Sequence, residues 1–442
     1  MTNSFLHRIK SWRTNTKLRE RSTEFVLSAF VVLLPFQWKF PPISLMIMLL
    51  GVVFLFFIDR DYLKNIRSNL YFKLILAYYA WVAIGLTYTD FPKEGGADLQ
   101  VQISLLAWPL GLAALNVVNQ KMIDRLTMLF VRAMGVSVVL CLMLATFAYL
   151  EDGNSSHFFY KNLSAWPLVP QHYMGMYVSF AIIILIFRWF FKRKSFRTIE
   201  HIELYILIAL FLLTQGLLSV RNQFIAFPLA ILPLLLTAKR KHLLTRRGIL
   251  KGLGIGAVLL AVIAILPGTQ RRIIETYHEL RSINHVVDKK QTNHRIYLWK
   301  YASETIGENW LLGTGTGGGN AALRENLKDC DAKYWDGSNV YYLYQKEYNA
   351  HNVFLQAWMT HGIIGFLLIV AILFIPLVRA TKRGDILTSG FIILATVSFL
   401  TESMLERQAG VMWFAVFYAL LVVAQRNEVT LANKNTPANL SK

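Results

Sequence analysis

The sequence predicts an all-α integral membrane protein, and three observations support this fold class. Hydrophobic residues make up 55% of the 442 residues and charged residues only 16%, against about a quarter in ordinary soluble domains. Apolar windows recur along the chain, each with about the 20 residues that a helix needs to cross a bilayer. Connections rich in Lys and Arg alternate with connections that have few. An ordinary cytosolic enzyme is therefore not expected.

Twelve windows are long and apolar enough to be membrane-spanning helices. They lie near residues 24–40, 42–58, 70–89, 99–118, 126–150, 172–191, 202–219, 222–237, 249–267, 353–378, 386–403 and 409–425. Because twelve is an even number, both ends of the chain are expected on the same side of the membrane.

Basic residues predict which side that is. With both termini in the cytoplasm, seven inner segments together hold 28 Lys and Arg, whereas each of five short outer connections holds one. This asymmetry is typical of the positive-inside rule. The net charge of +20 therefore follows mostly from topology, and no nucleic-acid partner is expected, because the basic residues are spread over separate segments.

The connection between the ninth and tenth helices is the exception to these short loops. It holds 11 basic and 10 acidic residues, and helices are predicted near 271–287 and 294–308. A long structured insertion often carries function. The chain is thus predicted in four parts, namely helices one to nine in 1–267, an outer loop domain in 268–352, helices ten to twelve in 353–425 and a polar tail in 426–442.

A glycine run in this loop, from Gly313 to Gly319, formally contains the GxGxxG pattern of dinucleotide-binding proteins. That fingerprint requires a preceding strand, and none is predicted. The run is interpreted instead as a flexible turn that lets backbone approach a ligand or the membrane surface.

Four residues on the outer face could carry chemistry: Arg221 between the seventh and eighth helices, Arg272 after the ninth, Arg295 in the loop and His351 at its end. Guanidinium groups offer paired donors and stay charged, so three of them could bind a diphosphate. Imidazole can accept a hydroxyl proton near neutral pH. Each residue also has a structural interpretation, because arginines snorkel or cap helices and a histidine can lie at headgroup level.

At this point the sequence resembles the O-antigen ligase family of bacterial inner-membrane glycosyltransferases. The family's most specific motif is a histidine followed by Asn, Ser or Gln, nine residues and Gly-x-x-Gly. It is matched here by His351-Asn352, VFLQAWMTH and Gly362-Ile-Ile-Gly365.

Three arginines extend the resemblance. Arg221 resembles the family's arginine at the outer end of the turn between the seventh and eighth spans. Arg295-Ile-Tyr-Leu-Trp299 resembles an Arg-x-x-x-Leu element in which Trp replaces Leu. Arg272 resembles an arginine shortly after the ninth span, although Arg271 could take that role.

The resemblance implies a GT-C-like glycosyltransferase with twelve spans in the bacterial inner membrane and an active site that faces the periplasm. It implies transfer of a glycan from undecaprenyl diphosphate to lipid A-core, with no metal ion and no cofactor. His351 would be the general base, and Arg221, Arg272 and Arg295 would bind the diphosphate.

Three alternatives stay open at this stage. A polymerase of O-antigen or capsular polysaccharide and a protein O-oligosaccharyltransferase would use the same class of donor, and the spacing of the His351 motif favours the ligase over both. A transporter of lipid-linked sugars would require ionisable residues near mid-membrane and repeated groups of spans. Charged residues inside the predicted spans are few, Lys73 and Arg132 lie near cytoplasmic ends where they can snorkel, and no clear repeat occurs.

Overall fold

The structure is a computed structural model that describes residues 15–36, 61–115, 117–164, 169–243, 294–328 and 348–424, together with Gln270, Ile274 and Tyr277. Within these residues the chain forms helices and turns, with no β-strand. The main helices are α2 Thr16–Leu33, α4 Asp61–Ser68, α5 Leu70–Ile84, α6 Pro92–Leu115, α7 Gln120–Asp152, α8 Tyr160–Leu163, α9 Gln171–Lys192, α10 Thr198–Leu218, α11 Gln223–Arg240, α14 His294–Glu308, α15 Gly318–Leu327, α17 Val353–Arg383, α18 Ile386–Phe399 and α19 Gln408–Tyr418.

Six of these helices are long and apolar enough to cross a membrane. They are α5 with the short 3₁₀ turn that follows it, α7, α9, α10, α11 and α17, while α18 and α19 are apolar but shorter. The all-α, multi-pass membrane class is confirmed. The count of twelve spans stays a prediction, because the windows near 42–58 and 249–267 lie outside the described residues.

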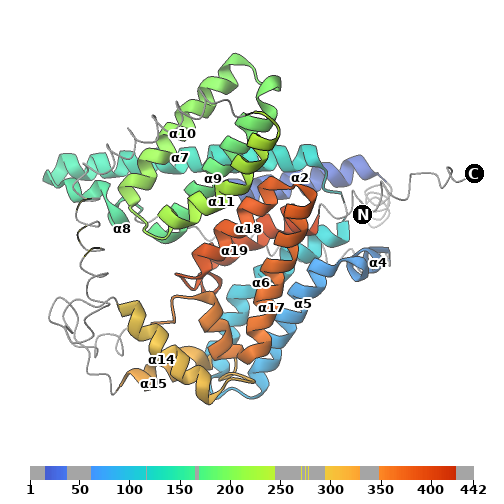
Figure 1. Cartoon of the computed structure of the whole chain (residues 1–442), viewed down its shortest axis with the longest axis vertical. Coiled ribbons are helices and arrows are strands. Elements are labelled where there is room, and N and C mark those ends of the chain that lie inside the picture. Colours follow the sequence, from blue (N-terminus) through green and yellow to red (C-terminus); the bar gives the residue numbers. More distant parts are fainter. Residues whose placement is uncertain are drawn as a thin grey trace, which may run out of the picture.

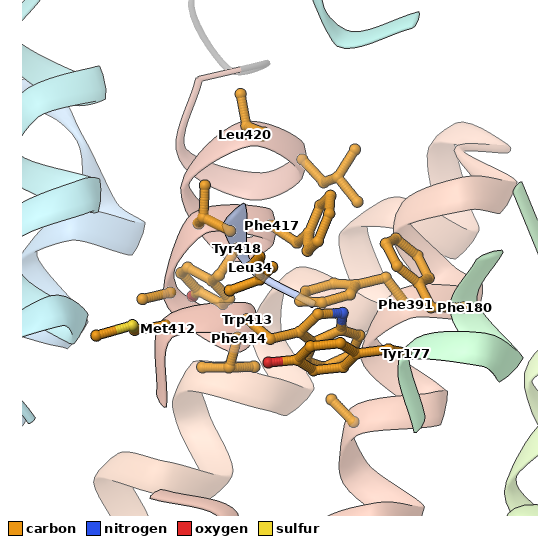
Figure 2. Close-up of a cluster of buried hydrophobic side chains, with 14 of the residues drawn as sticks. Leu34, Tyr177, Phe180, Phe391, Met412, Trp413, Phe414, Phe417, Tyr418 and Leu420 are labelled. Carbon is orange, nitrogen blue, oxygen red and sulfur yellow. The ribbon is translucent and has the colours of Figure 1, made fainter. Parts of the chain in front are cut away.

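Aromatic side chains fill the centre of the bundle where α9, α18 and α19 meet (Figure 2). The Phe180 and Phe417 rings lie 4.8 Å apart edge to face, and those of Phe391 and Trp413 lie 5.0 Å apart. Aromatic pairs at these distances add to the stability that burial alone provides. Since lipid tails are as apolar as these rings, close packing between helices has to hold the bundle together.

The outward surfaces of α7, α10 and α11 are strongly apolar. Phe147, Ile199 and Ile225 are 66%, 72% and 62% exposed. Such a surface is unfavourable in water but matches the hydrocarbon core of a bilayer. These three helices, which lie together in Figure 1, therefore provide lipid-facing surface.

A second, smaller core lies at the other end of the molecule, where α14 and α15 pack (Figure 1). Leu298 and Ala302 of α14, Leu323 of α15 and Met359 of α17 are fully buried in it. The start of α17 therefore packs with the helices of the long outer loop. The predicted helix near 294–308 is confirmed as α14.

Helix α17 is broken at Gly362, which has a φ of 65° and a ψ of −168°. Residues 353–361 form the first piece and residues 363–383 the second. Backbone N–H groups of Thr314 and Gly315 donate to the carbonyls of Met359 and Thr360, each at 3.0 Å. The indole of Trp81 donates to the His361 carbonyl at 2.8 Å. These donors satisfy the last carbonyls of the first piece, which would otherwise lack partners.

The glycine run allows this close approach. Gly313, Gly315 and Gly317 all have positive φ, between 74° and 89°. A Cβ atom on Gly313 would lie 2.5 Å from the Thr360 carbonyl oxygen, and one on Gly317 would lie 2.3 Å from the Gly95 nitrogen. The run is a turn of close backbone approach, and the backbone that it approaches is the protein's own. The predicted approach to a ligand or the membrane surface stays a prediction.

Candidate functional site

His351 is held at the start of α17 by the residues on either side of it. The Asn352 side chain caps the helix and accepts from the Phe354 and Leu355 N–H groups at 2.8 and 3.1 Å. The Asn349 side chain accepts from the His351 N–H at 3.0 Å. His351 itself has a φ of 46°, a left-handed conformation that costs free energy in a residue other than glycine. The surrounding bonds therefore fix the histidine in one strained position.

The imidazole of His351 faces a buried carboxylate. Its Nδ1 lies 2.8 Å from Oε1 of Glu402, whose side chain is only 11% exposed. Glu402 belongs to the turn between α18 and α19. Nη2 of Arg295, at the start of α14, donates to the other carboxylate oxygen at 3.2 Å. Two of the four predicted site residues, His351 and Arg295, thus meet at one carboxylate.

Electrostatics keep this carboxylate ionised. Burial alone would raise the pKa of Glu402, but the hydrogen bond from His351 and the nearby charge of Arg295 lower it below its usual value. An ionised carboxylate can only accept hydrogen bonds, so Nδ1 of His351 is the donor. Nε2 is then the ring nitrogen with a lone pair that could accept a proton.

Arg221 lies on the turn between α10 and α11, and this turn is bonded to the segment that carries Glu402. The side chain of Asn222 donates to Thr401 Oγ1 at 2.8 Å, and that of Gln223 donates to Ser398 Oγ at 3.0 Å. The half-buried Arg221 therefore directly precedes Asn222, the residue that bonds Thr401 next to Glu402. Arg272 and its neighbour Arg271 lie outside the described residues.

A second acidic residue of the same turn, Glu406, accepts a hydrogen bond from the Asn349 side chain. Between the two acids, Ser403 Oγ accepts from the Asn352 N–H at 3.1 Å. The segment 402–406 thus runs along the residues that flank His351 and contacts them at both ends.

The sequence reasoning missed Glu402 and Glu406. The eleventh predicted span, 386–403, included Glu402, whereas α18 ends at Phe399 and leaves it in the turn. The available signal was a pair of acids four residues apart in a strongly apolar stretch, because such residues in a membrane protein usually have a partner and a role.

The described residues contain no group of three or more His, Cys, Asp or Glu side chains arranged to hold a metal ion. The metal-independent chemistry implied by the resemblance stays a prediction.

One comparison with known proteins gives a match. Residues 206–370 match the family model described as O-Antigen ligase. The matched segment extends from α10 into the second piece of α17, so it contains Arg221, Arg295 and His351 but ends before Glu402. No curated protein matches the chain.

Proposed function

We propose that the protein is an O-antigen ligase. The match of residues 206–370 to the O-Antigen ligase family model supports a membrane glycosyltransferase of the ligase or polymerase type. The proposed ligase transfers O-antigen glycan from undecaprenyl diphosphate to lipid A-core on the periplasmic face of the bacterial inner membrane. The observation that carries the proposal is the Glu402 carboxylate, which bonds both His351 and Arg295.

In this proposal His351 is the general base. Its Nε2 takes the proton of the acceptor hydroxyl while the oxygen attacks the anomeric carbon of the donor glycan. The bond between that carbon and the diphosphate oxygen breaks, and the electron pair leaves with the diphosphate. Glu402, a positioning residue, stabilises the imidazolium that forms and holds the ring in one orientation. A well-placed base of this kind contributes about 10²- to 10⁴-fold to the rate.

The arginines stabilise the leaving diphosphate. Arg295 lies beside the base because it bonds Glu402 at 3.2 Å, and Arg221 lies on the turn bonded to the same segment. Arg272 is expected to join them. Each charge-assisted contact provides about 1.5 to 3 kcal/mol. Because diphosphate is already a good leaving group, positioning and charge stabilisation suffice without a metal ion.

The test uses the purified full-length protein in liposomes with an undecaprenyl diphosphate glycan. Lipid A-core, a second lipid-linked repeat unit and a protein acceptor are supplied separately. We expect transfer to lipid A-core and a loss of at least about 10²-fold in His351→Ala. His157→Ala is the matched control, because His157 lies in the connection between α7 and α9 and pairs with Asp152 at 2.7 Å rather than with Glu402.

The outcomes separate the alternatives. Transfer only to the second repeat unit would identify a polymerase, and transfer only to protein would identify an oligosaccharyltransferase. Full activity in His351→Ala would contradict the assigned base. In the same assay Arg221→Ala should raise the KM for the donor more than that for the acceptor, and an equal rise in both would indicate a structural role.

A further inference from the structure

A small cavity lies next to the turn that carries Glu402, between α5, α6, the first piece of α17 and residues 403–406. Its polar lining comes from all four of these parts: Tyr78 of α5, Asp98 and Gln102 of α6, Gln356, Thr360 and His361 of α17, and Ser403 and Glu406 of the turn. It has room for about one water molecule or one hydroxyl group. The cavity is called the acidic pocket below.

Two buried polar side chains that line the acidic pocket each have one atom without a hydrogen-bond partner among the described residues. Gln102 is 6% exposed, and its Oε1 accepts no hydrogen bond from the described residues. His361 is 4% exposed, and its Nδ1 has no hydrogen-bond partner among those residues either. Buried polar atoms without a partner are rare, and leaving them unsatisfied is costly. Both atoms therefore point to a small ligand that carries hydrogen-bonding groups.

The pocket favours an uncharged ligand. Burial, with help from the nearby Asp98 carboxylate, raises the pKa of Glu406 to about 8, so its carboxyl group is mostly neutral at pH 7. Burial, with help from Glu94, raises the pKa of Asp98 to about 6. An acidic site of this kind repels a diphosphate. It contrasts with Glu402, four residues earlier, whose neighbours include Arg295 and His172.

The acidic pocket is joined directly to the residues around His351. Glu406 accepts from the Asn349 side chain, and Ser403 accepts from the Asn352 N–H. Asn349 and Asn352 lie two residues before and one residue after His351. A group bound in the pocket is therefore close to the group on which His351 acts.

We propose that the acidic pocket is a hydroxyl-binding subsite, in which Gln102, Asp98 and Glu406 hold one hydroxyl of the acceptor sugar beside the hydroxyl that His351 deprotonates. The inference rests on the proposed function. A sugar hydroxyl both donates and accepts, so it can satisfy the amide oxygen of Gln102 and a carboxyl group together. Donor glycans carry the same chemistry, but their first sugar is attached to the diphosphate, which the arginines bind.

The test measures the KM for donor and acceptor separately in the liposome assay with Gln102→Ala and the isosteric Asp98→Asn. We expect the acceptor KM to rise by about 5- to 10-fold in each variant, with the donor KM within twofold of the wild type. The matched control is Ser104→Ala, because Ser104 is a buried, unpartnered polar residue of α6 that does not line the pocket. Its acceptor KM should stay unchanged.

Several results would overturn the subsite. An unchanged acceptor KM in both variants would do so, and so would a rise in the donor KM alone. An acceptor KM that rises as much in Ser104→Ala as in the two pocket variants would also do so. Wild-type protein that transfers to no acceptor would reject the proposed function instead. In that case, binding of deacylated lipid A-core oligosaccharide, followed by intrinsic tryptophan fluorescence, still tests the pocket, and equal affinity in wild type and Gln102→Ala would refute it.

Discussion

The contact with Glu402 favours a functional interpretation of His351 over a structural one. A histidine at a membrane boundary is an ordinary headgroup-level residue, but His351 is bonded to a buried carboxylate at 2.8 Å and held in a left-handed conformation. The carboxylate selects one tautomer of the imidazole. The left-handed backbone of His351 costs free energy, and strained residues of this kind are common at functional sites. The histidine motif was visible in the sequence. Its partner was not, because it lies 51 residues away along the chain.

Replacing Glu402 by Gln should separate positioning from binding. The amide keeps the shape of the side chain but removes the charge that orients and stabilises the imidazolium. We expect kcat to fall by roughly 10²-fold with little change in either KM. Steady-state kinetics in liposomes measure this, and Glu402→Asp should restore part of kcat. A variant that raises the KM values while kcat is unchanged would contradict the positioning role.

At the scale of the elements, the break in α17 explains the spacing of the histidine motif. Nine residues separate Asn352, which caps the helix, from Gly362, which ends its first piece. A Cβ atom at Gly362 would lie 2.1 Å from the Leu311 carbonyl oxygen, and one at Gly365 would lie 2.3 Å from the His361 Cβ. Both glycines are therefore required by close packing around the break.

Gly362→Ala should disrupt the outer part of the molecule. The positive φ alone costs about 1 to 3 kcal/mol in a residue other than glycine, and the contact with the Leu311 carbonyl adds to this. We expect a lower melting temperature in detergent and loss of glycan transfer. Gly307→Ala in α14 is the control, because its Cβ meets nothing within 4 Å. Equal melting temperatures for the two variants would contradict this explanation.

At the scale of the whole molecule, the site is assembled from segments far apart in sequence. The turn after α10, the start of α14, the start of α17 and the turn after α18 meet around Glu402. The charge asymmetry of the loops predicts that all four lie on the periplasmic side. The connection between α9 and α10, with its cluster of basic residues, is predicted in the cytoplasm.

Cysteine labelling in whole cells tests this orientation. Exposed serines are available on both sides, Ser156 between α7 and α9 and Ser195 between α9 and α10. In a Cys330→Ser background, with Cys141 buried, a membrane-impermeant maleimide should label Ser156→Cys in cells with a permeabilised outer membrane. Ser195→Cys should react only after the inner membrane is opened as well. The reverse pattern would invert the topology and reject a periplasmic site.

The sequence by itself determined the all-α membrane class and the helix near 294–308. It also singled out His351 and Arg295, which the structure brings to one carboxylate and whose roles stay a prediction. Hydropathy, charge and motif spacing are local properties, so they can be read along the chain. Only the tertiary structure decided that Glu402 joins these residues, that α17 breaks at Gly362 and that unpartnered polar groups gather beside the site. Each of these depends on contacts between distant segments. A local pattern can single out an unusual residue, such as an acid in an apolar stretch, but it does not name the residue's partner.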